Sequence, residues 1–173
     1  VNAYTITIEV VVSQGTGFFV VGLPDNAIKE SQQRVEAALK FRGYRMPRTK
    51  VVVNMAPADI RKEGSAYDLP IAVGILHASQ QLNTEKLGEY VLMGELALDG
   101  ALRPIRGVLP IAIQARKEGF KGFILPRENA EEAAIVNNLD IIPVDTMQEA
   151  VDFLEGRLDI QPLVIDTRDV FQH

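Results

Sequence analysis

The stretch MGELALDGALRPIRGVLPIAIQARKEGFKGFILPREN, residues 93–129, carries the clearest secondary-structure signals of the chain. Asp99-Gly100 is typical of a tight hairpin turn between two strands. Val108–Lys117 is expected to form a helix that ends at Gly119, since glycine readily adopts the left-handed conformation at a helix C-terminus. A strand over 122–125 follows the helix. The stretch therefore predicts a hairpin and then a crossover from strand through helix to strand.

On both sides of this stretch the sequence alternates strand and helix patterns. Residues 3–12 are rich in β-branched side chains and predict a strand, with an antiparallel partner over 18–23 after a glycine turn. The run KVVVNMA, residues 50–56, predicts a strand that is covered on both faces. The further expected elements are strands over 90–98, 101–104 and 140–144, and helices over 25–41, 68–81, 129–136 and 146–154. This order predicts a two-layer α/β sandwich with a mixed β-sheet.

Two aspartates are expected to cap helices, because their carboxylates accept hydrogen bonds from the first free amides. Asp25 follows Pro24 at the start of the first helix, and Asp68 stands at the start of the second. Ser31 falls within the apolar stripe of the first helix and is expected to fill the turn between its larger neighbours.

The length of 173 residues fits one domain, which the pattern places over 3–155. From Gly156 the pattern fades, so 156–173 is expected to be a tail or linker, and the start at Val1 indicates a segment of a longer protein. The absence of cysteine excludes disulfides and thiolate chemistry. No apolar run approaches the roughly 20 residues that span a bilayer, and no signal peptide is visible, so a cytoplasmic location is expected.

Charge is distributed unevenly along the chain. Residues 1–62 hold nine basic and five acidic side chains, whereas residues 63–173 hold nine and 18. The basic excess is concentrated in Lys40, Arg42, Arg45, Arg48 and Lys50. Such a cluster suits phosphates or an acidic partner. The alternative is a solvated helix end, where cations also favour the helix dipole.

A search for catalytic and metal-binding motifs finds few candidates. The chain has no GxxxxGK[ST] loop and no GxGxxG fingerprint, so no nucleotide-binding motif is present. His77 lies inside a predicted helix without neighbours that suit a triad or a zinc site, and is interpreted as structural. No metal site is expected.

Lys62 and Ser65 are the one pair that suggests nucleophilic chemistry. A Ser–Lys dyad needs a neutral, desolvated lysine in contact with the hydroxyl. Lys62 lies between Arg61 and Glu63 in a polar loop, which favours a charged, solvated ammonium. Ser65 is therefore interpreted, like Asp68, as a helix-capping residue.

Three blocks of the sequence resemble a known family. The blocks VVGLPDNAIKESQQRVEAAL (Val20–Leu39), VNMAPADIRKEGSAYDLPIA (Val53–Ala72) and residues 93–129 resemble the Lon-type proteolytic domain, and more closely the N-terminal domain of magnesium chelatase-like AAA+ proteins of the ComM/YifB type. The resemblance covers roughly residues 3–155. It implies a ribosomal S5 domain 2-like fold, in agreement with the element order.

The resemblance also indicates which catalytic residues are missing. Lon proteases place the nucleophilic serine in a Lys-Asp-Gly-Pro-Ser-Ala-Gly string, which aligns with residues 62–68 and puts Ala66 at the serine position. Their lysine ends a Pro-Ile-Gly-Gly-Leu-Lys string, which aligns with residues 104–109 and puts Leu109 at the lysine position. Ser65 is one residue out of register, a rotation of about 100° at a helix start. The prediction is a domain without protease activity, in which Leu109 is a core residue.

The resemblance implies a parent protein that is an AAA+ ATPase, a ring-shaped, hexameric DNA motor related to competence proteins. ATP and Mg²⁺ are expected only in an ATPase module outside this chain, and no cofactor within it. The predicted role is subunit assembly, DNA contact or both. The overall acidity, with a sequence pI near 5.1, favours the alternative of assembly without nucleic acid, and a cryptic Ser–Lys hydrolase is the third possibility. The DNA-binding candidates are Lys40, Arg42, Arg45, Arg48, Lys50, Arg61, Lys62, Arg103 and Arg106.

Overall fold

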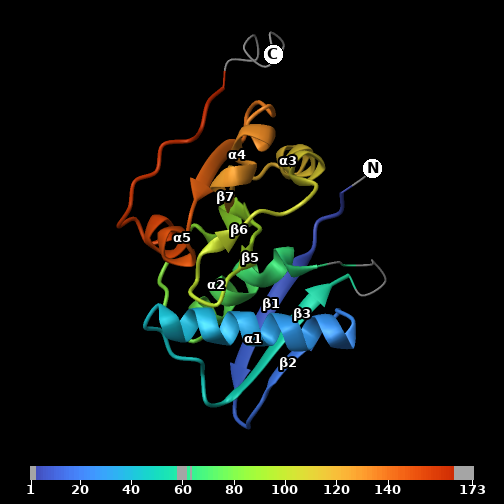
Figure 1. Ribbon diagram of the computed structural model, residues 1–173, viewed down its shortest axis with the longest axis vertical. Helices are drawn as coiled ribbons and strands as arrows, with labels where there is room; N and C mark the ends of the chain where they lie inside the picture. The colour runs from blue at the N-terminus through green and yellow to red at the C-terminus, as the bar shows by residue number, and fades with distance from the viewer. Residues whose placement is uncertain (1–2, 58–61, 63, 166–173) are drawn as a thin grey trace.

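The computed structural model describes residues 3–57, 62 and 64–165. Figure 1 shows an elongated molecule with the N-terminal elements at its lower end and the C-terminal elements above them. In chain order the elements are β1 (Thr7–Ser13), β2 (Phe18–Val21), α1 (Asp25–Phe41), β3 (Lys50–Ala56), η1 (Ser65–Tyr67), α2 (Asp68–Ala78), η2 (Leu87–Glu89), β4 (Tyr90–Leu92), β5 (Glu95–Leu96), β6 (Leu102–Arg103), α3 (Val108–Lys117), β7 (Gly122–Pro126), α4 (Arg127–Ala133), β8 (Asp140–Val144) and α5 (Met147–Leu154). The protein is a mixed α/β sandwich, as predicted, although its strands are divided between two three-stranded sheets and a hairpin.

The lower sheet has the strand order β1-β3-β2, so the predicted hairpin pairing of β1 with β2 is wrong. β3 lies between them, antiparallel to β1 and parallel to β2. The physical reason is burial. Val51, Val53 and Met55 of β3 are fully buried, and the central position gives this strand, the most buried of the three, hydrogen-bonding partners on both edges.

Helices cover only one face of the lower sheet, so the prediction of a β3 covered on both faces is also wrong. In Figure 1 α1 crosses in front of the strands. Its buried residues, Val35, Ala38 and Leu39, join α2 and the buried face of β3 in one apolar core. The opposite face carries Val52, which is half-buried, and exposed side chains of β1 and β2.

The upper sheet is parallel, with the order β4-β7-β8. Every residue of β7 is buried. Phe123 and Leu125 face a core made with α3 and α4, whereas Ile124 faces the core that includes α5. The predicted helix over 108–117 is confirmed, and α5 begins with a capping box between Thr146 and Glu149. After α5 the chain runs along this sheet, where the Leu163 amide donates to the Ile141 carbonyl at 2.8 Å.

The predicted strand over 90–98 is interrupted in the structure. β4 ends at Leu92 and β5 begins at Glu95, because Gly94 turns its backbone toward α2. Its amide donates to the Ala66 carbonyl at 2.8 Å, and its carbonyl accepts from the Leu69 amide at 3.0 Å. The interruption therefore fixes the start of α2 against the hairpin of β5 and β6.

Candidate functional site

The corner between η1 and α2 holds the position predicted to align with the Lon nucleophile. Ala66 occupies the middle of η1, and its methyl group contains no atom that can attack a carbonyl. Its carbonyl accepts the Gly94 amide, so a backbone hydrogen bond helps to hold the corner in place.

Asp68 forms a buried polar anchor directly after this corner. The capping prediction is wrong for Asp68 and also for Asp25, because each is the first helical residue and neither helix has a side-chain cap. The buried Asp68 carboxylate accepts from Ser31 Oγ at 2.9 Å, Arg34 Nε at 2.6 Å and the Leu96 amide at 3.0 Å. Three elements, α1, α2 and β5, therefore meet at one carboxylate.

The electrostatics of this anchor combine opposing effects. Burial raises the pKa of the Asp68 carboxyl above its ordinary value, against the lowering effect of the hydrogen bonds from Arg34 and from the Leu96 amide. The hydrogen bond between Arg34 and Asp68 also raises the pKa of the Arg34 guanidinium. Because Ser31 donates its hydroxyl to this carboxylate, it serves in the anchor and does not merely fill a turn.

Ser65 is held by a carboxylate at the rim of the corner. Its hydroxyl donates to Glu95 Oε1, and Glu95 Oε2 lies 3.8 Å from Arg103 Nε. A carboxylate is a far weaker base than a neutral amine, so this geometry leaves the hydroxyl unactivated. It also pairs part of the positive charge of Arg103 within the protein.

Lys62 is buried, which corrects the prediction of a solvated ammonium. Its residue retains only 3% exposure, and its Nζ donates to the Pro57 carbonyl at 2.6 Å. Ammonium groups are buried only where hydrogen bonds replace the lost water. The side chain thus joins two parts of the loop after β3, and it does not offer its charge to the surface.

Leu109 lies in the first turn of α3, at the position predicted to align with the Lon lysine. The helix starts after Gly107, whose φ of +73° lies in the left-handed region that favours glycine. Val108 is fully buried, whereas Leu109 is half-buried and packs against the core beneath α3 and α4. The prediction of a core position is met only in part, and the side chain has no atom that can exchange a proton.

A basic groove runs between the end of α1, the loop that follows it and the end of α2. Its volume is about 1060 Å³, and Lys40, Arg45 and Arg48 contribute its cations. All three are exposed. Gln81 fixes the loop, since its Nε2 donates to the Arg45 carbonyl at 2.7 Å and its Oε1 accepts the Arg45 amide at 2.9 Å.

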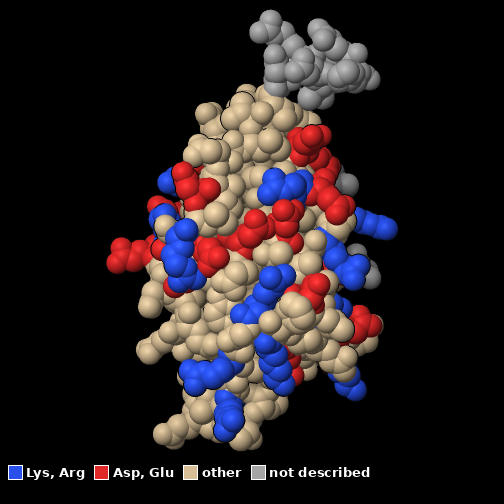
Figure 2. Space-filling model, turned by 60° about the vertical axis from the view of Figure 1, so that its left-hand side comes forward, with Lys and Arg blue, Asp and Glu red and all other residues tan. Residues whose placement is uncertain are grey.

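The surface charge is segregated around this groove. In Figure 2 the charged side chains at the lower end are mostly Lys and Arg, whereas Asp and Glu gather higher on the molecule. Glu36 is the one acidic residue among the groove's described lining, which also includes Tyr44, Thr49 and Ser79. No sequence motif predicted that Tyr44 and Gln81 line the groove, because the groove forms from segments that are distant along the chain.

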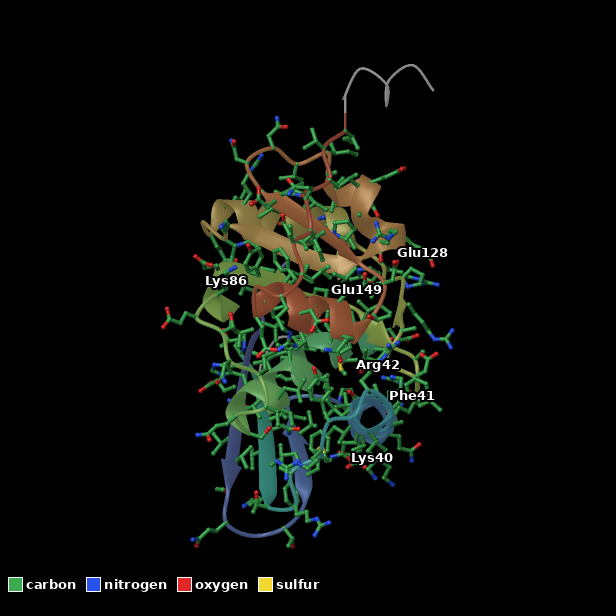
Figure 3. All side chains as sticks on the ribbon, turned by 90° about the vertical axis from the view of Figure 1, so that its left-hand side faces the viewer. Lys40, Phe41, Arg42, Lys86, Glu128 and Glu149 are labelled. Carbon is green, nitrogen blue, oxygen red and sulfur yellow. The ribbon has the colours of Figure 1, made fainter. Side chains whose placement is uncertain are left out.

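The remaining DNA-binding candidates do not join this groove. Figure 3 places Arg42 on the other side of the end of α1 from Lys40, and Arg42 Nε donates to the Asp99 carbonyl at 2.8 Å. Lys50 lies on the open face of the lower sheet, over the Phe19 ring. Arg106 is exposed in the loop before α3. Arg61 lies outside the described residues.

Metal-ligand clusters and membrane-spanning helices were both sought among the described residues. Over 3–57, 62 and 64–165 no three His, Asp or Glu side chains gather in a way that could hold a metal ion. His77 is exposed on α2. In the same part of the chain, no helix combines the length and the apolar character that crossing a membrane requires.

The fold and the site together define a Lon-like α/β domain with Ala66 in η1 and Leu109 in the first turn of α3. Residues 8–129 match the family described as subunit ChlI of Mg-chelatase, and the chain belongs to this family. It is 46% identical over 158 residues to the uncharacterized protein YifB of Escherichia coli strain K12, and 43% identical over 158 residues to the competence protein ComM of Haemophilus influenzae.

Both alignments cover 91% of this chain and 31% of the relative, so the chain spans about a third of the length of these proteins. A more distant similarity, 29% identity over 126 residues, is to Lon protease 2 of Bacillus subtilis, and covers 72% of this chain and 22% of that protein.

Proposed function

We propose that this chain is a non-proteolytic domain of a magnesium chelatase-like AAA+ ATPase, and that it binds DNA phosphates through the basic groove while contributing to subunit assembly. The observation that carries the proposal is the groove itself. Lys40, Arg45 and Arg48 project from one concave surface in a protein whose net charge is −5. Segregation of positive charge against an acidic background is typical of a phosphate-binding surface.

The loss of protease activity is supported by four side chains around the α2 corner. Ala66 and Leu109 supply neither nucleophile nor base, and Ser65 donates to the Glu95 carboxylate. Lys62 donates to the Pro57 carbonyl. A Ser–Lys mechanism requires a neutral amine that accepts the serine proton. These contacts support a scaffold that is related to Lon and lacks the proton transfer of a Ser–Lys dyad.

The groove is suited to phosphates because its loop is fixed before a ligand arrives. Gln81 holds the Arg45 backbone through two hydrogen bonds, so the arginine side chain starts from a defined position. Preorganisation reduces the ordering cost that binding would otherwise carry. Three cations that each neutralise a phosphate release about three condensed counterions, which supports binding that depends on salt and not on sequence.

The test is fluorescence anisotropy with labelled single-stranded and duplex DNA at low salt. The variant Lys40→Glu/Arg45→Glu is expected to lower the affinity at least tenfold. The matched control is Lys86→Glu/Lys117→Glu, which makes the same change in net charge at exposed positions outside the groove. The control is expected to lose much less affinity. Equal losses in both variants would show that net charge alone governs binding.

Assembly without nucleic-acid contact is the second candidate, and the acidic upper half of the molecule favours it (Figure 2). The same titration separates the two functions. If the wild-type chain binds no DNA at low salt, in isolation and in the assembled parent protein, the DNA part of the proposal fails and assembly is the role that remains. The proposed function also includes a ring-shaped parent protein, whose ATPase module binds ATP and Mg²⁺.

A further inference from the structure

The open face of the lower sheet carries a continuous apolar row. Val11 is 56% exposed and Phe19 is 49% exposed. The strand register places them on the two sides of Val52 of the central strand, so the three side chains follow one another across the sheet. Val21, 50% exposed, lies next to this row. Contiguous exposed apolar surface of this kind marks sites of interaction.

Opposite charges flank the apolar row. Glu9 lies two residues from Val11 toward one end of the strands, and Lys50 lies two residues from Val52 toward the other end. Each charge is therefore about 7 Å from the row, since a strand rises about 3.4 Å per residue. Lys50 Nζ lies 5.6 Å from the centroid of the Phe19 ring, which keeps the cation close to the apolar surface.

We propose that this open face, defined by Glu9, Val11, Phe19, Lys50 and Val52, packs against the same face of a second copy of this chain. A two-fold axis along the apolar row stacks this row on the same row of the other copy. The same axis places the row of Glu9 in each copy opposite the row of Lys50 in the other copy. A purely acidic or purely basic partner would match only one of the two flanking rows. The inference deepens the assembly part of the proposed function and rests on it.

The size of the face sets the expected strength of association. Three short strands offer less surface than the roughly 800 Å² per partner of a standard interface, so the isolated chain is expected to dimerise with a Kd in the micromolar range or weaker. A two-fold contact cannot join neighbouring subunits of a cyclic ring, so it pairs subunits of two rings. Several such contacts acting together raise the effective concentration and make so small a contact sufficient.

Cross-linking tests the two-fold geometry directly, because the chain contains no cysteine. Packed sheets lie about 10 Å apart, which a short bis-maleimide can bridge between two thiols near the axis. Val11→Cys is expected to give a covalent dimer at micromolar concentration. Lys86→Cys, exposed and distant from this face (Figure 3), is the control and is expected to remain monomeric.

Charge reversal tests which residues hold the copies together, with sedimentation velocity in the absence of DNA as the readout. Lys50→Glu is expected to weaken dimerisation roughly three- to tenfold, since it places like charges opposite one another. The double variant Glu9→Lys/Lys50→Glu restores the opposite pairing and is expected to recover most of the loss. Phe19→Asp is expected to abolish the dimer, whereas Phe41→Asp, at an exposed phenylalanine on α1, leaves it unchanged.

Three outcomes overturn the inference: a monomer at every concentration, a dimer insensitive to Phe19→Asp, or a Lys50→Glu defect that the double variant does not relieve. DNA affinity is measured separately with the groove variants. Loss of dimerisation with intact DNA binding would therefore refute the sheet interface alone, while loss of DNA binding with an intact dimer would refute only the groove.

Discussion

Asp68→Ala is expected to destabilise the protein by about 3 to 4 kcal/mol, because it removes the acceptor at which α1, α2 and β5 meet. The carboxylate is fully buried. Its removal leaves the Ser31 hydroxyl and the Leu96 amide without an acceptor, and a buried donor left unsatisfied costs about 1–3 kcal/mol. Arg34 adds less to the loss, because its side chain keeps 22% exposure and lies 3.9 Å from Glu30.

Urea unfolding followed by circular dichroism measures this change. Asp145→Ala is the control, since Asp145 pairs with Arg127 at 3.0 Å on the surface, where an exposed ion pair is worth at most about 1 kcal/mol. If Asp68→Ala lowers the free energy of unfolding by less than about 1 kcal/mol, the buried anchor is not what holds the α2 corner.

Three further predictions concern pH, backbone and chemistry. Burial raises the pKa of Asp68, so the native state binds the carboxyl proton more tightly than the unfolded state does. The free energy of unfolding of the wild type, relative to that of Asp68→Asn, should therefore fall as pH rises from 3.8 through the raised pKa. If urea titrations show this difference rising with pH instead, the hydrogen bond from Arg34 lowers the pKa of Asp68 by more than burial raises it. Gly22→Ala should unfold at much lower urea than Gly43→Ala, because both have positive φ but only the Gly22 methyl would meet a backbone oxygen, 2.5 Å away. A serine-reactive fluorophosphonate should label neither the wild type nor Ser65→Ala, and wild-type labelling that disappears in the variant would contradict the loss of proton transfer.

The sequence predicted the fold where local signals were strong. The helix over 108–117 and the hairpin turn at Asp99-Gly100 depend on apolar spacing and on glycine, which act within a few residues. The pairing of β1 and β2 could not be predicted in this way. Their separation depends on competition with β3, which lies about thirty residues further along the chain and gains more from the central position.

The site was predictable only in part, for the same reason. The alignment of residues 62–68 and 104–109 predicts that Ala66 and Leu109 occupy the dyad positions, and the basic run indicated Lys40 and Arg45. The sequence could not show that Lys40 lines the groove and Arg42 does not. Arg42 points away because it donates to the carbonyl of a residue 57 positions further along the chain. The role of Asp68 was hidden likewise, since its partners come from 28 to 37 residues away.

The salt dependence of DNA binding is the most direct test of the central claim that the groove of Lys40, Arg45 and Arg48 binds phosphates. The plot of log K against log salt is expected to have a slope between about −2 and −3 for the wild type, as three phosphate contacts require. Lys40→Glu/Arg45→Glu should make that slope shallower by the contribution of about two phosphate contacts. Lys86→Glu/Lys117→Glu should leave the slope nearly unchanged. A slope near zero in the wild type, or one that the groove variant does not alter, would contradict the account.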